Sequence, residues 1–523
     1  MVRPVYVRRV GHASALGLSA PEAAWAQLAG DGTPEFRELF GGRYPWFALP
    51  LAERAWGARV RRAVERVGAE LCAGMSSAEI AALPFFFGSS SLQAGAIEDA
   101  ARASGNVELS FNAADFGAEV GAMLGIATTP WVFSTGCSSG LAALEAALVL
   151  IGCGQIDEAL VLGAEFANDT TLAGFAGLGL LASTREDEGL ILGEAVGGLL
   201  LSATPPDTSS WRIAACRLGV DGYSATAPTP DGSAIAANLA GALADAGREA
   251  GEIDLVKPHR GRLPSTDEAE EAALARIFGA RRPAEIFFKR QLGHTLGASG
   301  TAELSALLAL LDSAAGQARY GVVQRLLFNL IGFGGSIAAL VLERGGERQN
   351  IGADAGAGLK IATAAPHPQR FDSATLAARA RARCSTPLRR AGVLTELLIA
   401  GVAACLGDDA RGSTVVLWGS RGGVRDACIR VVSDIALAGE APLPFDFLAT
   451  QPVLAAIPLQ QSFPCIESVL YQPWTQDAAL HWQRLLQLGE AWLASGRSKR
   501  VLCGVIEPGD HEHTGQWRVL EIA

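Results

Sequence analysis

The sequence predicts an α/β protein in which a sheet with parallel strands lies between helices, an α/β/α arrangement. Helical and strand patterns alternate along the chain, and strand–helix–strand order implies parallel pairing. Of the 523 residues, 49% are apolar, 19% are charged and 61 are glycine. This composition excludes a coiled coil and a disordered tail protein. At about 150 residues per domain, the length corresponds to about three domains or one large duplicated architecture.

Each expected element has its own local signal. A buried strand over residues 83–88 ends at a glycine–serine turn, and an apolar run over 130–134 precedes a helical pattern that glycine terminates. In chain order we expect a strand over 6–10, a helix over 54–72, strands over 83–88 and 130–134, a helix over 140–154, strands over 159–163 and 254–259, and a helix over 301–311.

Charge and targeting signals predict a cytoplasmic protein. The net charge of −11 gives nucleic acid or an anionic membrane no global attraction, so any basic docking patch must be local. The N-terminus lacks the apolar stretch of a signal peptide, and the uncharged segment 120–144 contains Pro130 and glycines, which excludes a membrane span. The nine cysteines form no CxxC pair and are expected to be reduced.

Two segments rich in proline or glycine divide the chain, and 345–358 is a better linker candidate than 203–209. Such segments break helices and strands, so they separate the elements on either side. The domain prediction is a first domain over 1–345, a linker over 346–381 and a further domain over 382–523.

Beyond the linker the sequence resembles its own beginning. Residues 389–401 resemble 61–74, and in both places a strand with a glycine–serine turn follows. Residues 141–165 then superpose without gaps on 483–507. Any two amphipathic helix–strand units look somewhat alike, but the ordered agreement of three units favours a duplication.

Cys137 stands out among the cysteines. It lies in Ser134-Thr-Gly-Cys-Ser-Ser-Gly140, between a buried strand and the start of a helix. Unpaired N–H groups at a helix start act as a partial positive charge, which is expected to lower the thiol pKa and favour the nucleophilic thiolate. The small neighbours allow close approach of a substrate. The alternative is an inert buried cysteine, which would be the preferred interpretation if no other candidate catalytic residue accompanied Cys137.

Two of the seven histidines lie in loops bounded by glycine or proline. His259 closes the strand-like Asp254-Leu-Val-Lys-Pro-His, and His294 stands in Lys289-Arg-Gln-Leu-Gly-His-Thr-Leu-Gly-Ala-Ser-Gly300. Polar side chains in loops held by a rigid scaffold are candidates for chemistry. The histidines therefore favour a nucleophilic role for Cys137.

Together these motifs resemble those of the β-ketoacyl-acyl-carrier-protein synthases, condensing enzymes with the thiolase fold. Cys137 matches the family's nucleophile in its Cys-Ser-Ser-Gly setting, and Gly193-Glu-Ala-Val-Gly-Gly resembles its Gly-Glu-Gly-Ala-Gly strand. His259 and His294 match its two catalytic histidines, and Asn329-Leu-Ile-Gly-Phe-Gly-Gly-Ser resembles its closing loop. The resemblance implies thiolase-like duplicated α/β/α layers.

The resemblance covers residues 1 to about 345 and implies decarboxylative Claisen condensation in fatty acid, polyketide or aryl polyene-type biosynthesis. Cys137 would take an acyl group from the phosphopantetheine arm of an acyl carrier protein. His259 and His294, as neutral imidazoles, would stabilise the enolate left when CO2 departs. The N–H groups of Cys137 and Phe333 would form the oxyanion hole. No metal or other cofactor is implied.

The resemblance also assigns supporting residues and marks one departure. By this resemblance, Lys289 is expected to pair with Glu270 and to organise the site electrostatically. Without the resemblance, Lys289 would be interpreted as a surface lysine. The family's Gly-Thr-Gly-Thr, which binds pantetheine, is replaced by Arg260-Gly-Arg262-Leu, so pantetheine must be held differently. The expected substrate-binding residues are Phe111, Phe447, Gly332 and Gly334.

The C-terminal copy is expected to be inert. By the gapless superposition the position of Cys137 falls at Ala479, and no counterpart of the half with His259 and His294 follows. Residues 382–508 thus resemble an additional thiolase-like half-domain, similar to the chain-length-factor-like proteins that accompany some ketosynthases. We expect it to supply, within one chain, the partner with which condensing enzymes commonly dimerise. The alternative is an appendage that only covers apolar surface.

The expected partners are an acyl carrier protein and, beyond it, pathway enzymes or a second ketosynthase subunit, with no nucleic acid and no membrane. Carrier docking is expected at a basic patch of Arg281, Arg282 and Arg290, with an ordinary solvated charge cluster as the alternative. Two other functions stay open. One is a catalytically silent partner of another ketosynthase, which the change to Arg260 and Arg262 makes conceivable. The other is a coenzyme A thiolase, which the glycine-rich loop contexts disfavour.

Overall fold

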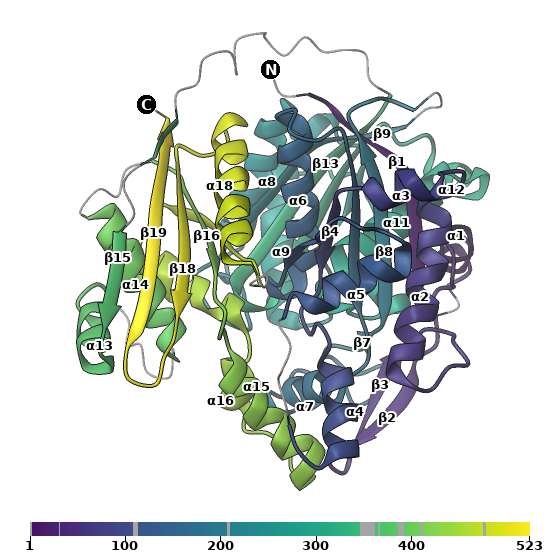
Figure 1. Ribbon diagram of the computed structural model, residues 1–523. Helices are drawn as coiled ribbons and strands as arrows, with labels where there is room; N and C mark the ends of the chain where they lie inside the picture. The colour runs from purple at the N-terminus through teal and green to yellow at the C-terminus, as the bar shows by residue number, and fades with distance from the viewer. Residues whose placement is uncertain are drawn as a thin grey trace.

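The computed structural model describes all residues except 1–2, 31, 108–112, 207–209, 346–360, 364–366, 385–391, 408–411, 474–476 and 523. The α/β class and the thiolase-like layers predicted from the sequence are confirmed: large sheets lie between helices (Figure 1). No helix among the described residues has the length and apolar character needed to cross a membrane.

Ten strands form one sheet whose two halves share a topology. In each half three strands pair antiparallel in succession and two more continue in parallel. The first half consists of β1 (Val5–Ser14), β8 (Ala195–Ser202), β6 (Glu158–Glu165), β4 (Phe85–Gly88) and β5 (Trp131–Phe133). The second half consists of β9 (Trp211–Val220), β13 (Ser336–Arg344), β12 (Arg325–Ile331), β10 (Leu255–Lys257) and β11 (Ala284–Glu285). A short ladder between β1 and β9 joins the halves.

The C-terminal part of the chain forms a separate sheet with the topology of the first half. One antiparallel pair, β19 with β18, is followed by β16 and β17 in parallel, as β8 and β6 are followed by β4 and β5. The sheet consists of β14 (Ile361–Thr363), β19 (His513–Ile522), β18 (Arg500–Glu507), β16 (Thr414–Gly419) and β17 (Ile466–Tyr471), with β15 (His367–Phe371) also on β19. We call the described residues from 361 onward the C-terminal unit.

The C-terminal unit begins earlier than the sequence predicted. The predicted linker covers 346–381, yet β14 and β15 pair with β19, and α13 (Ser373–Arg381) packs on α14 (Gly392–Leu406). These strands cover the edge of β19, as β1 covers that of β8. β15 is mostly exposed and lacks the apolar alternation that marks a strand in a sequence, which explains the error.

A carboxylate at the end of one strand supports the same turn in both copies. Glu165 ends β6 and accepts the N–H groups of residues 90 and 91, each at 3.0 Å, in the turn after β4. Glu507 ends β18 and accepts those of residues 421 and 422, at 2.6 and 3.0 Å, in the turn after β16. Glu165 and Glu507 are also equivalent in the gapless sequence superposition, so the repeat extends to individual hydrogen bonds.

Two apolar helices lie between the halves of the ten-stranded sheet. α6 (Ser139–Gly152) contacts β4, β6 and β9, whereas α11 (Ser299–Asp312) contacts β1 and β8. Every residue of α6 is buried, which is why its sequence is apolar all round and not along one stripe. α2 (Trp56–Leu71) packs on the first half and α8 (Ser233–Ala246) on the second, so helix and sheet layers alternate.

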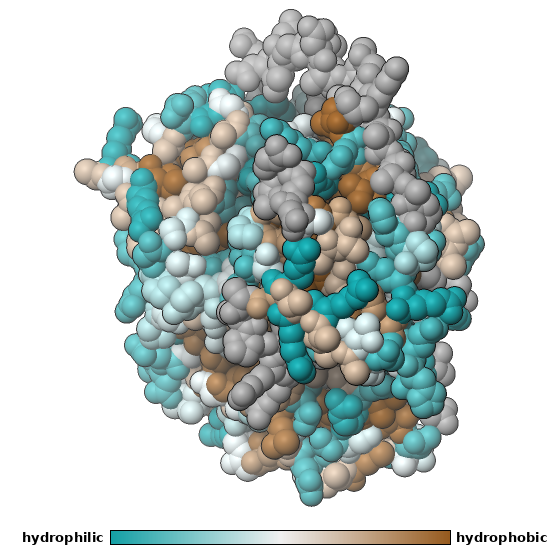
Figure 2. Space-filling view, turned by 90° about the vertical axis from the view of Figure 1, so that its left-hand side faces the viewer, coloured by the Kyte–Doolittle hydropathy of each residue, from teal (hydrophilic) through white to brown (hydrophobic). Residues whose placement is uncertain are grey.

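The C-terminal unit packs on α6 and on the strand before it. α18 (Ala478–Ala494) lies beside α6 in Figure 1, and its Arg484 donates to the carbonyl oxygens of Thr129 and Pro130 at 2.5 Å each. The guanidinium also lies 4.8 Å from the centroid of the Trp131 ring. On the outward face seen in Figure 2, apolar side chains form scattered patches among polar ones. The apolar residues of α18 instead join the main core.

A contact between a buried carboxyl group and an arginine also joins the two units. Glu145 is the one charged residue of α6, and it pairs with Arg497 of the C-terminal unit at 3.2 Å. Arg497 also donates to the carbonyl oxygen of Cys216. Burial raises the pKa of Glu145 to about 8, although Arg497 opposes the shift. The carboxyl group of Glu145 is thus shared between Arg497 of the C-terminal unit and the backbone of Leu218 on β9.

Replacing Arg484 by methionine is expected to lower the urea midpoint of unfolding. The change leaves the carbonyls of Thr129 and Pro130 without their donor, which costs roughly 1–3 kcal/mol. Arg370→Met is the control, because the Arg370 side chain is 75% exposed and its ion pair with Glu512 contributes little. Unfolding followed by tryptophan fluorescence measures both midpoints. Equal midpoints for wild type and Arg484→Met would contradict the role assigned to this contact.

Candidate active site

Cys137 lies in a tight turn at the start of α6. The turn η1 (Gly136–Ser138) joins β5 to the helix, and Cys137 is 3% exposed. Gly136 adopts a φ of +63°, a left-handed conformation that favours glycine. The Thr135 N–H donates to the Ser139 hydroxyl at 3.0 Å and closes the turn. The thiol is thus held in a fixed position at the N-terminal end of a central helix.

The pKa expected for this thiol is wrong. Burial raises the pKa of Cys137 to about 11, and the N–H groups of Phe333 and Cys137 and the charge of Lys289 oppose this only in part. The loss of hydration outweighs the helix start that was expected to lower the pKa. Cys137 is therefore a neutral thiol at neutral pH in this structure.

The two histidines lie next to each other. Their ring centroids are 5.7 Å apart with planes at 74°, and both rings line the same cavity as Cys137. The Leu296 N–H donates to Nδ1 of His294 at 3.0 Å, which leaves the ring proton on Nε2. Burial and the charges of nearby lysines hold the pKa of both imidazoles well below the usual value, so both are neutral at neutral pH.

His259 is held through its backbone. It follows β10, and the N–H groups of His259 and Arg260 donate to the buried carboxylate of Glu270 at 2.5 and 2.9 Å. The Asn329 amide donates to the same carboxylate at 2.6 Å. Glu270, on α9 (Pro264–Phe278), therefore fixes the turn that carries His259.

The expected ion pair between Lys289 and Glu270 is wrong. Lys289 opens α10 (Lys289–Leu292) and pairs with Glu303 on α11, while Lys257 of β10 pairs with the other oxygen of Glu303. All three side chains are buried. Glu303 and Lys257 could not be identified from the sequence, because one glutamate in an apolar helix and one lysine at a strand end have no spacing that marks them as partners.

A narrow cavity of about 40 Å³ borders Cys137 and both histidines, which is room for about one or two waters. Its lining also includes the hydroxyl-bearing residues Ser224, Thr226 and Thr266 and the loop residues Gly332 and Phe333. Gly334 was expected to contact substrate but lies outside this lining. It has a φ of +77°, and a Cβ at Gly334 would lie 2.8 Å from the side chain of Val453 in the C-terminal unit.

A second cavity, of about 20 Å³, also borders Cys137 and is closed by the C-terminal unit. Phe447 of α16 (Pro444–Ala449) is 2% exposed, and its ring centroid lies 5.6 Å from that of Phe175. The polar part of the lining consists of Ser90, Ser91, Thr171 and Gln451. Phe111, the other residue expected here, lies outside the described residues.

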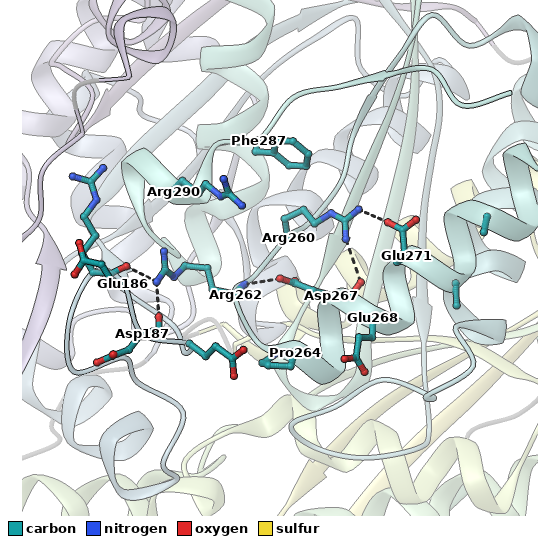
Figure 3. Close-up of a pocket in the computed structure, with 14 residues that line it drawn as sticks. Glu186, Asp187, Arg260, Arg262, Pro264, Asp267, Glu268, Glu271, Phe287 and Arg290 are labelled. Carbon is teal, nitrogen blue, oxygen red and sulfur yellow. Dashed lines mark hydrogen bonds and ion pairs between the residues drawn. The ribbon is translucent and has the colours of Figure 1, made fainter. Parts of the chain in front are cut away.

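A larger pocket of about 1120 Å³ opens beside the turn after β10 (Figure 3). Arg260 and Arg262, at φ of +43° and +70°, occupy the left-handed region that favours glycine. Arg260 pairs with Glu271, and Arg262 donates to carbonyl oxygens of residues 185, 187 and 189. The two arginines thus tie the loop over 182–189 and α9 to the turn that carries His259.

The three arginines of the expected docking patch differ in their surroundings. Arg282 pairs with Glu271 and with Glu285, so its charge is compensated within the protein. Arg281 is exposed, and Arg290 is exposed and lines the large pocket. Acidic residues 186–188 line the same pocket, so its charge is mixed and not uniformly basic. Within the described parts of the chain, no group of three or more His, Cys, Asp or Glu side chains is arranged to hold a metal ion.

Comparison with known proteins identifies two matching domain models. Residues 63–205 match the N-terminal domain of β-ketoacyl synthase and residues 211–316 match its C-terminal domain. The 3-oxoacyl-[acyl-carrier-protein] synthase 2 of Mycobacterium tuberculosis is 30% identical over 248 residues, which are 40% of this chain and 59% of the relative. The chain thus spans about three fifths of the length of the curated relatives that it matches.

Solved structures share the fold at low identity. The PfaC keto synthase–chain length factor covers 99% of this chain and 78% of its own, with a TM-score of 0.69 at 12% identity. The ketosynthase ApeO of Xenorhabdus doucetiae, in complex with its chain length factor ApeC, covers 66% of this chain and 98% of its own, with a TM-score of 0.55 at 22% identity. Residues 63–205 and 211–316 are therefore similar to the two domains of the β-ketoacyl synthases.

Proposed function

We propose that the chain is an active β-ketoacyl synthase that joins an acyl group on Cys137 to a malonyl unit on an acyl carrier protein. The observation that carries this proposal is the convergence of Cys137, His259 and His294 on one narrow cavity. A silent partner has no use for a nucleophile that faces two neutral imidazoles. These three residues come from three separate turns, which a chance arrangement would not align.

The first step would transfer the acyl group to the protein. Sγ of Cys137 attacks the acyl thioester, its proton passes to the departing pantetheine sulfur, and the carrier leaves as the free thiol. The N–H groups of Cys137 and Phe333, which both hydrogen-bond toward the thiol, would stabilise the oxyanion of the tetrahedral intermediate. A Cβ at Gly332 would lie 3.2 Å from that of Cys137, so glycine leaves room for this intermediate.

The second step would form the new carbon–carbon bond. The malonyl C–C bond to the carboxylate breaks, CO2 leaves, and the electron pair becomes an enolate. Nε2–H of His294 and a ring N–H of His259 would donate to the enolate oxygen, because both imidazoles are neutral. The enolate carbon then attacks the thioester on Cys137, the C–S bond to Cys137 breaks, and the departing thiolate takes up one proton from solvent.

The C-terminal unit would act as a built-in partner of the condensing unit over 1–345. Three observations support this: the unit repeats the first half's topology, it covers α6, and its Phe447 closes the cavity next to Cys137. Ala479, which matches Cys137 in the superposition, lies in the first turn of α18 and has no nucleophile to offer. The small cavity favours a short acyl group as the primer.

Carrier docking is proposed at the large pocket, whose lining includes Arg290, and at the exposed Arg281. The pantetheine arm would pass from this pocket toward Cys137. The hydroxyls of Ser224, Thr226 and Thr266 would replace those of the family's threonines, because they line the cavity beside both histidines. Arg282 would support the pocket through its glutamate pairs and not contact the carrier.

Alanine at His259 or His294 is expected to lower decarboxylation by about 100-fold or more and to lower acylation of Cys137 much less. The histidines are assigned to the enolate and not to thiol attack. CO2 release from malonyl-carrier and the intact mass of the acyl-enzyme measure the two steps separately. Cys137→Ala is the control and should acquire no acyl mass. Acylation by that variant, or a loss of acylation without a loss of CO2 release, would refute the assigned roles.

Phe447→Ala is expected to lengthen the accepted acyl chain without reducing the reactivity of Cys137. The change removes the ring that closes the small cavity and leaves a void beside Phe175. A panel of acyl-carrier thioesters of increasing length, read by intact mass, gives the preference. Phe463→Ala, at a buried position of the same unit away from this cavity, is the matched control. An unchanged preference in Phe447→Ala would show that the C-terminal unit does not limit the acyl chain.

Reversing the charges of Arg281 and Arg290 to glutamate is expected to raise the apparent KM for the carrier several-fold and to weaken its salt dependence. Arg319→Glu, an exposed charge reversal on α12 (Ala314–Tyr320), is the control. Steady-state kinetics at several ionic strengths measure both effects. A double variant with the wild-type KM and salt dependence would place carrier docking elsewhere.

A further inference from the structure

Lys257 is a buried charge with no role in the reaction proposed above. It ends β10, two residues before His259, and is fully buried. Its Nζ pairs with Glu303 and lies 3.4 Å from the carbonyl oxygen of Asn329. The same ammonium lies 4.2 Å from the centroid of the Phe328 ring, a cation–π distance. Lys257 is therefore held on several sides within the core.

Two lysines share one carboxylate in this cluster. Lys289 and Lys257 each pair with one oxygen of Glu303, and the three side chains are buried. One lysine would neutralise Glu303, so the second adds a positive charge. An uncompensated buried charge destabilises the folded state, and an apolar side chain would avoid that cost. Glu270, the next carboxylate, is already bound by two backbone N–H groups and an amide.

We propose that Lys257 is a positioning residue: together with Lys289 it keeps a positive charge behind His259 and His294, so that both imidazoles stay neutral. The effect of the lysines on the histidines does not depend on the proposed function. Its consequence for the enolate does rest on the proposed function: a neutral imidazole would donate a hydrogen bond to the enolate without bringing an extra proton into the decarboxylation step.

The surroundings of Lys257 support this role. The titratable groups that face it are Glu303 on α11, Lys289 on α10, Glu270 on α9, and the two histidines. Burial lowers the pKa of Lys257 to about 8; Lys289 adds to this shift and Glu303 opposes it. Lys257 is therefore charged at neutral pH and loses its charge as the pH rises through about 8. After burial, Lys289 lowers the pKa of both histidines; Lys257 comes next for His294, whereas for His259 the effect of His294 precedes that of Lys257.

The test is an NMR titration of the imidazoles in the full chain, which needs no activity. The chain has seven histidines, and single His→Gln variants assign the His259 and His294 signals. In wild type both should titrate well below pH 6.5. In Lys257→Met both midpoints should rise by roughly one pH unit, because the change removes one of the two buried lysine charges that disfavour protonation of the rings. Lys257→Gln, a smaller polar replacement, serves if the methionine variant does not fold.

Lys499→Met is the matched control, because it removes the same charge from an exposed position of the C-terminal unit. It should leave both midpoints unchanged. Wild-type histidines that titrate near pH 6.5, or folded Lys257 variants with wild-type midpoints, would overturn the inference. A purely structural Lys257 would alter stability without moving these midpoints.

The pH profile of malonyl decarboxylation gives the second readout. Activity falls at low pH when an imidazole takes up a proton, so the acid limb of Lys257→Met should move to higher pH by the same amount as the midpoints. A wild-type protein without decarboxylase activity would refute the proposed function, while the imidazole titration still decides the role of Lys257.

Discussion

The architecture depends on the complete burial of α6. Because every residue of this helix is buried, each of its sides needs a partner, and no single sheet can provide all of them. The two halves of the large sheet cover part of the helix, and α18 covers another part. The pairing of Glu145 with Arg497 follows from the same constraint, since a carboxylate on a fully buried helix needs a cation from a neighbouring element. The turn at the start of this enclosed helix carries Cys137, so this thiol is rigidly held and poorly hydrated.

Loss of hydration acts in opposite ways on the groups of the site. It makes the thiol of Cys137 harder to ionise and both imidazoles harder to protonate, so all three are neutral. The charges lie behind them, where two lysines hold Glu303 and three donors hold Glu270. The reacting groups are thus uncharged at rest, and fixed charges and dipoles surround the place where negative charge would develop.

The sequence predicted well what depends on local spacing. Cys137, His259 and His294 could be recognised because glycines and prolines mark the turns that carry them. The repeat could be recognised because helix and strand lengths are kept between the copies. Directions of side chains could not be read: Lys289 turns to Glu303 on another helix, while Glu270 turns to backbone N–H groups. The thiol pKa was misjudged because the helix start is visible in the sequence and the depth of burial is not. β15 was missed because its exposed residues lack any pattern.

The covalent attachment of the C-terminal unit has a consequence for how this contact can change over time. In a symmetric pair of identical chains, each interface residue occurs twice, and one mutation alters both sides of the contact together. Here different parts of the chain encode the two sides: Arg484 contacts Thr129 and Pro130. A mutation on one side therefore leaves the other side unchanged. The side that faces Cys137 can therefore be altered without altering residues 1–345. The covalent link also fixes the local concentration of each side relative to the other, so the contact does not depend on the protein concentration in the cell.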